Sequence, residues 1–182
     1  MDSRLFSGAL VTCLLAGCAP MTVHHDYDPD VDFSLYRSFS WMPVPTQDEE
    51  AKSILSGPFL EKRIKKAVVE NLTSKGFEKT TRDPDLLIAY HINFKNKTDV
   101  GVRRHGCGYW GHRAVDVRRY KEGTLILDFV DPESRELAWR GWSVSPIHPD
   151  SSPQEEQENL YRAVTEILKR YPPYDNPEGG KL

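Results

Sequence analysis

The sequence has 182 residues and a formal net charge of −3 at pH 7. This near balance of charge gives no general electrostatic reason to bind nucleic acid, so no nucleic-acid partner is expected. After the apolar segment at the N-terminus, no second hydrophobic run approaches the roughly 20 residues that cross a bilayer. The length suits one domain, which can bury about 70% of the surface that its unfolded chain exposes.

The N-terminal segment has the pattern of a signal peptide. Arg4 provides a positive charge, and residues 5–16 are apolar apart from one serine and one threonine. This run is too short to cross a bilayer. It ends in Leu15-Ala16-Gly17-Cys18, which resembles the lipobox of bacterial lipoproteins. An ordinary secretory signal cut at another position is the alternative.

The lipobox resemblance implies that residues 1–17 are removed and that Cys18 becomes the acylated first residue, a palmitate-type modification. Ala19 stands where inner-membrane retention usually requires aspartate. By the same resemblance, the protein is expected in the cell outer membrane, facing the periplasm. Cys13 then leaves with the signal peptide, and Cys107 has no cysteine with which to form an intramolecular disulfide.

The remaining chain divides into three parts. Residues 18–20 form the lipidated N-terminus and the start of a linker, residues 21–173 form one domain, and residues 174–182 form a flexible tail. Within the domain, strands are expected at residues 22–27 and 37–42, followed by a surface loop at residues 42–57. A helix begins at Pro58 and ends before Gly76. Its buried face is expected to hold Leu60, Ile64, Ala67, Val68 and Leu72.

The second half of the domain predicts a hairpin and a second helix. A short strand is expected at residues 77–80 and a longer one at residues 86–95, and residues 97–121 have the irregular pattern of an exposed loop. Strands at residues 124–130 and 137–144 form the hairpin, with a turn that Asp131 opens. Its expected core face holds Leu125, Leu127, Phe129, Leu137 and Trp139, and its other face pairs Asp128 with Arg140.

The second helix begins at a capping box, Ser152-Pro153-Gln154-Glu155, and stops at Pro172-Pro173. Two amphipathic helices and four to six mostly sequential strands predict an α+β domain. We expect a single, mostly antiparallel sheet with both helices packed on one face.

Several short segments occur in a distinctive order along the domain: Asp32-Phe33-Ser34-x-Tyr36 with Phe39 and Trp41, Gly76-Phe77, Pro84-Asp85-Leu86-Leu87, residues 123–128, Trp139-Arg140-Gly141, and Ala163-Val164 to Tyr171-Pro172-Pro173. With the lipobox, these segments resemble the bacterial lipoproteins of domain of unknown function 4136. The resemblance implies an envelope lipoprotein with an α+β domain. It implies no activity and no catalytic residue.

Candidate metal ligands occur in one short stretch. His105, Cys107 and His112 carry the imidazole and thiolate groups that zinc and copper prefer, and His91 is a possible fourth ligand. The spacing does not follow the paired pattern of known zinc sites, so a glycine-rich loop is the competing interpretation. The same cysteine and histidines could supply a nucleophile and a base, but no third group or oxyanion hole is recognisable.

The same region is also the most basic part of the chain. Positive and aromatic residues alternate there, and the candidate binding surface comprises Arg103, Arg104, Tyr109, Trp110 and Arg113. Such a surface suits anionic lipid head groups, a glycan or a partner protein. A solvated loop is the alternative.

Together these patterns favour a non-enzymatic, lipid-anchored periplasmic protein that binds or bridges components of the bacterial envelope. An envelope enzyme or metal/redox protein using Cys107 with His105 and His112 is the first alternative. A carrier with an apolar pocket between sheet and helices is the second. No cofactor is expected beyond the covalent lipid at Cys18.

Overall fold

The computed structural model describes residues 21–42, 58–105, 112–147 and 150–173. The elements in chain order are β1 (Thr22–Tyr27), η1 (Phe33–Leu35), β2 (Ser38–Trp41), α2 (Pro58–Ser74), β3 (Glu78–Lys79), β4 (Leu86–His105), β5 (His112–Val130), β6 (Leu137–Ile147) and α3 (Pro153–Leu168). Among these residues no helix is long and apolar enough to span a membrane.

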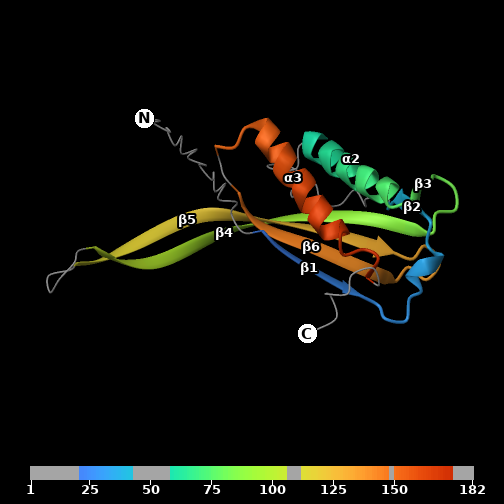
Figure 1. Cartoon of the computed structure of the whole chain (residues 1–182), viewed down its shortest axis with the longest axis horizontal. Coiled ribbons are helices and arrows are strands. Elements are labelled where there is room, and N and C mark those ends of the chain that lie inside the picture. The colour runs from blue at the N-terminus through green and yellow to red at the C-terminus, as the bar shows by residue number, and fades with distance from the viewer. Residues whose placement is uncertain (1–20, 43–57, 106–111, 148–149, 174–182) are drawn as a thin grey trace, which may run out of the picture.

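The strands form one six-stranded sheet in the order β1-β6-β5-β4-β2-β3. The pairs β1–β6, β6–β5 and β5–β4 are antiparallel, whereas β2 pairs in parallel with both β3 and β4. Both helices lie over the same face of the sheet (Figure 1). The predicted α+β class, the mostly antiparallel sheet and the two helices on one face are confirmed.

The core lies between this sheet face and the helices. α2 buries Ile64, Ala67, Val68 and Leu72, as its spacing predicted, and Leu60 packs at the edge of the core. α3 starts at the predicted capping box, in which the Ser152 hydroxyl accepts from the Glu155 backbone amide. Fully burying one large aliphatic side chain contributes about 1.5–3 kcal/mol, so this packing explains why both segments are helical.

Aromatic side chains fill the end of the core below α3. The ring of Tyr171 lies 4.5 Å from that of Phe129 and 5.2 Å from that of Trp139, measured between centroids. Gly141 allows this packing, because a Cβ there would lie 2.2 Å from a Trp139 ring carbon and 2.6 Å from Ile167. A glycine therefore lets the indole and α3 rest directly on the sheet.

The structure corrects the predicted core face of the hairpin at one position. Leu125, Leu127, Phe129 and Trp139 are buried, but Leu137 is 41% exposed and Ala138 is buried instead. The cause is a β-bulge: Phe129 pairs with Trp139 and Val130 pairs with Leu137, so that Ala138 is an extra residue. A bulge breaks the alternation on which the prediction relied.

The structure also corrects the loop predicted at residues 97–121. β4 continues to His105 and β5 begins at His112, and the two strands pair from Lys97 with Tyr120 to His105 with His112. Valines at alternate positions explain the extension, since β-branched residues favour strands. We call residues 96–105 and 112–121 the ribbon. It runs past the ends of both helices and out from the rest of the sheet (Figure 1).

Candidate functional site

The ribbon holds three residues of the predicted binding surface. Arg103 and Arg104 lie in β4, and Arg113 lies in β5 directly opposite Arg104. The other two predicted residues, Tyr109 and Trp110, lie outside the described residues. The register thus brings Arg104 and Arg113 opposite each other, on paired strands instead of a loop, whereas Arg103 lies at the alternate position and pairs with Ala114.

Two of the predicted metal ligands lie on paired strands. The register places His105 opposite His112, whereas Cys107 lies outside the described residues. His91 precedes His105 by 14 positions on the same strand, roughly 45 Å along an extended chain, so it cannot be a fourth ligand of that site. Within the described ranges, no group of three or more His, Cys, Asp or Glu residues is arranged to hold a metal ion.

The register gives the ribbon two different faces, because residues directly opposite in an antiparallel pair lie on the same face. We call one the valine face: its pairs are Asn96–Lys121, Thr98–Arg119, Val100–Val117, Val102–Val115 and Arg104–Arg113. We call the other the mixed face: its pairs are Lys97–Tyr120, Asp99–Arg118, Gly101–Asp116, Arg103–Ala114 and His105–His112.

The two faces differ in charge. The valine face holds four cationic residues, four valines and no acid. The mixed face holds three Lys or Arg residues against two aspartates, and one of these, Asp99, lies opposite Arg118. The alternating valines could have predicted two paired strands in this region. The neighbouring glycines and charges suggested a loop instead.

Where the ribbon leaves the sheet, aromatic and lysine side chains are exposed. Phe94 is 37% exposed and Tyr120 is 38% exposed, and Lys95, Lys97 and Lys121 are exposed beside them. The Lys97 ammonium lies 3.7 Å from a Glu122 carboxylate oxygen. Beyond the pairing of Lys121 with Ile147, β5 has only β4 as a neighbour among the described strands.

The sheet face opposite the helices carries the predicted pair of Asp128 and Arg140, and the structure confirms it. Arg140 donates through Nε and Nη2 to the two Asp128 oxygens, at 2.6 Å each. These hydrogen bonds raise the pKa of Arg140. His91 Nε2 lies 3.5 Å from Asp128 Oδ2. The bidentate geometry links β5 to β6 and occupies the carboxylate, so its role is structural.

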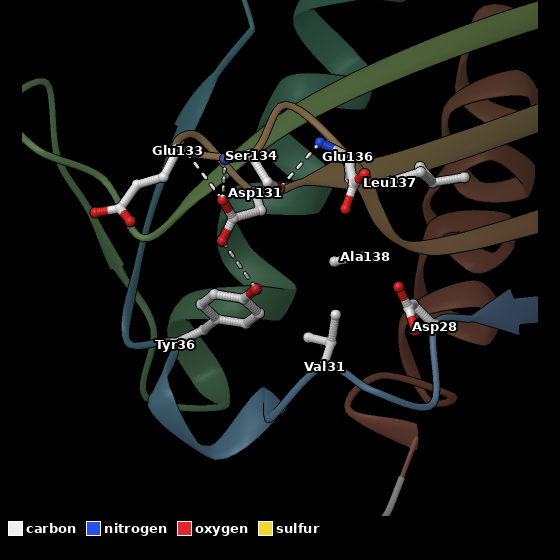
Figure 2. A pocket seen from close by; sticks show the side chains of 9 residues that line it. All are labelled: Asp28, Val31, Tyr36, Asp131, Glu133, Ser134, Glu136, Leu137 and Ala138. Carbon is white, nitrogen blue, oxygen red and sulfur yellow. Dashed lines mark hydrogen bonds between the residues drawn. The ribbon is translucent and has the colours of Figure 1, made fainter.

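A shallow pocket lies where the segment after β1 meets the β5–β6 turn (Figure 2). It has a volume of about 300 Å³ and is lined by Asp28, Val31, Tyr36, Asp131, Glu133, Ser134, Glu136, Leu137 and Ala138. The side chain of Tyr36 points toward Asp131, and its hydroxyl donates to Asp131 Oδ2 at 3.2 Å. The contact joins residues 95 positions apart, which sequence reasoning missed because no local pattern links them.

Two titrating groups of this pocket, Asp131 and Tyr36, are held in states that do not suit acid–base catalysis. Asp131 accepts from the backbone amides of Glu133 and Ser134, at 2.9 and 2.8 Å, and these bonds lower its pKa. Burial, followed by the charge of Asp131, raises the pKa of Tyr36 to about 12. Asp131 therefore closes the turn, as its sequence position predicted.

One solved structure shares the fold. A PDZ domain protein from Parabacteroides distasonis matches with a TM-score of 0.55 and 17% identity, covering 84% of this chain. The chain spans only 36% of that protein's length. The PelC dodecamer from Paraburkholderia phytofirmans matches with a TM-score of 0.45 and 9% identity, over 82% of this chain and 95% of that one. No curated protein matches the sequence.

A family model for a domain of unknown function, DUF4136, matches residues 23–173. Apart from Thr22, the first residue of β1, the match covers every strand and helix described above, which agrees with the order of short segments seen in the sequence. The chain therefore belongs to the DUF4136 family.

Proposed function

We propose that this protein is a lipoprotein of the bacterial envelope, anchored through a covalent lipid on Cys18 and facing the periplasm from the outer membrane. It acts there as a non-enzymatic binding module, and the ribbon is its binding element. The lipobox supports the anchor and the basic, uncovered ribbon supports the binding role.

The observation that carries the proposal is the position of the ribbon relative to the start of the domain. Thr22, the first residue of β1, pairs with Val144, which pairs with Thr124, which pairs with Asn93. The ribbon leaves the sheet just beyond this row. The domain therefore starts at the same end from which the ribbon projects (Figure 1).

The described polar groups favour binding over catalysis. Asp128 is occupied by Arg140, and Asp131 is occupied by turn amides. A phenol with a pKa of about 12, as Tyr36 has, is a poor general base at neutral pH. An enzyme based on Cys107 would need His105 and His112 as partners. Among the described residues, the support for this is that these two histidines lie opposite each other in the strand register.

The anchor is tested with Cys18→Ala in cells given a clickable palmitate analogue. Wild type should incorporate the analogue and sediment with outer membranes, and Cys18→Ala should lose the label. Cys107→Ala is the matched control and should keep it. A second form, in which residues 1–17 are replaced by an ordinary cleaved secretory leader and Cys18 by alanine, should be released as soluble periplasmic protein. Continued labelling of Cys18→Ala, or full membrane attachment of the second form, would contradict the proposal.

A further inference from the structure

The two end strands of the sheet, β1 and β3, are protected against pairing with another chain. Just after β1, the amide of Asp28 donates to Ala138 of β6 at 3.0 Å, so the amide of Tyr27, one position earlier, points away from β6. Asp26 Oδ1 accepts from that outward amide at 3.0 Å. β3 has only two residues. Occupied or very short edges of this kind are a common device against edge-to-edge association.

β4 has an edge without such protection, beyond the end of β2. β2 stops beside Ile88, whose carbonyl oxygen accepts from the amide of Met42 at 2.8 Å. Ile88 therefore faces this edge, and the backbone groups of every second residue face it too. These are the groups of Tyr90, Ile92, Phe94 and Asn96. Among the described strands none pairs with them on this side, whereas β5 pairs with the opposite edge of β4 along the whole stretch.

The side chains along this edge divide into an apolar row and a basic row. On the side of the helices, Tyr90 and Ile92 pack against the core and Phe94 is 37% exposed. On the opposite side lie Lys95 and Lys97, because successive side chains of a strand point to opposite faces. All side chains from residue 93 to residue 98 are exposed. A strand added here would therefore contact both rows with its alternate side chains.

The charges decide which kind of strand fits this edge. Residues 90–98 include two lysines and no acid. A second copy paired through the same edge by a two-fold axis would bring its own two lysines to the same side of the joined sheet, and like charges there are unfavourable. An acidic strand would instead place its carboxylates beside Lys95 and Lys97. Apolar side chains on the other side of that strand would cover Phe94.

We infer that residues 90–96 of β4 bind an extended segment of a partner protein in which apolar and acidic residues alternate. The segment adds a further strand to the sheet. Main-chain hydrogen bonds to the open edge provide affinity, and the apolar and basic rows provide specificity. The inference goes beyond the proposed function, because it requires neither the lipid on Cys18 nor the residues of the predicted binding surface.

The test uses the chain from Ala19 to Leu182, which retains every described residue, and a synthetic valine–glutamate peptide long enough to pair with residues 90–96. Amide hydrogen exchange is followed residue by residue by NMR. In the free chain, the outward amides of Ile92 and Phe94 should exchange fast. At a peptide concentration about ten times Kd they should exchange about tenfold more slowly, because only about a tenth of the chain is then unbound. The amides of His91 and Asn93, which face β5, should change little.

Charge-reversal variants test whether the basic row selects the partner. Lys95→Glu with Lys97→Glu should weaken binding of the peptide about tenfold or more, since each surface ion pair contributes up to about fivefold and repulsion replaces it. The same variant should bind a valine–lysine peptide, which wild type should not bind. The matched control is Lys75→Glu with Lys79→Glu, which changes two exposed lysines just after α2 and in β3. This control should bind the valine–glutamate peptide within about twofold of wild type, because distant surface charges are screened.

Three results would overturn the inference. Slow exchange of the Ile92 and Phe94 amides in the free chain would mean that the edge is already paired, with a second copy if the effect grows with protein concentration and within the same chain if it does not. Equal slowing of the inward and outward amides by the peptide would indicate general stabilisation instead of strand addition. Equal loss of binding in both charge-reversal variants would mean that net charge, and not this edge, attracts the peptide.

Discussion

The two halves of the β4–β5 pair make a direct comparison, because the same strands serve both. In the inner half, Ile88, Leu127 and Phe129 are fully buried beneath the helices. In the outer half, alternate positions hold valines and cations, and no described helix covers them. Alternating apolar residues therefore form a strand in both halves. They form a core only in the inner half, where the helices pack over one face of the sheet. Fold stability should depend on the inner half and binding on the outer half.

The largest expected effect tests the core that the inner half shares with β6. Trp139→Ala removes a fully buried indole that packs against Phe129 and Tyr171. The change should reduce the free energy of unfolding by about 3–5 kcal/mol, as large-to-small core substitutions do. Chemical denaturation monitored by circular dichroism measures it. An unfolding midpoint equal to that of wild type would contradict the assigned core.

Glycine substitutions compare the core, where Gly141 of β6 lies, with the ribbon at matched chemistry. Gly141→Ala places a Cβ 2.2 Å from the Trp139 ring, and overpacking of this kind costs about 3 kcal/mol. Gly101→Ala lies on the mixed face of the ribbon and should change stability by about 0.5 kcal/mol or less. Thermal denaturation of both variants checks the difference. Equal losses would mean that the ribbon is as tightly packed as the core.

A smaller effect tests how β2 is held beside β4. Asp85 Oδ2 accepts from the backbone amides of Arg37 and Ser38, at 2.9 and 2.7 Å, and from the Ser38 hydroxyl at 2.8 Å. Asp85→Asn should cost about 1–2 kcal/mol at neutral pH, because it weakens bonds to a charged acceptor.

The same contact predicts a pH dependence. The backbone bond from Arg37 is the main cause that lowers the pKa of Asp85 from its ordinary value of 3.8. A lowered native pKa means that the unfolded chain takes up the proton first. The contribution of Asp85 is therefore complete above pH 3.8 and is lost as the pH falls through the native pKa. Denaturation of wild type and Asp85→Asn across this range should show the difference shrinking on acidification; a constant difference would count against it.

The smallest expected effect on stability belongs to the ribbon. Replacing Arg103, Arg104 and Trp110 together with alanine should leave the melting transition within about 0.5 kcal/mol of wild type, as for surface sites away from a core. Binding of the same chain, lacking residues 1–18, to isolated envelope fractions should weaken, most strongly at low salt. A large loss of stability would show that the ribbon belongs to the folding unit.

Local patterns in the sequence determined the elements of this fold. Helical spacing predicted the buried face of α2, and the capping box placed the start of α3, because these features depend on residues a few positions apart. Alternation predicted the pairing of Asp128 with Arg140 across the hairpin. The short segments in order also identified the family that the family model later matched.

Only the tertiary structure decided the features that depend on contacts between residues far apart in the chain. The parallel position of β2 beside β4 and the bond from Tyr36 to Asp131 join distant segments. The bulge at Ala138 shifts the register within the hairpin, which simple alternation does not reveal. The ribbon was missed for a related reason: Val100 and Val102 gain meaning as a strand only when Val117 and Val115 lie opposite them. A sequence records which residues can pair, but the register of the whole sheet determines which of them do.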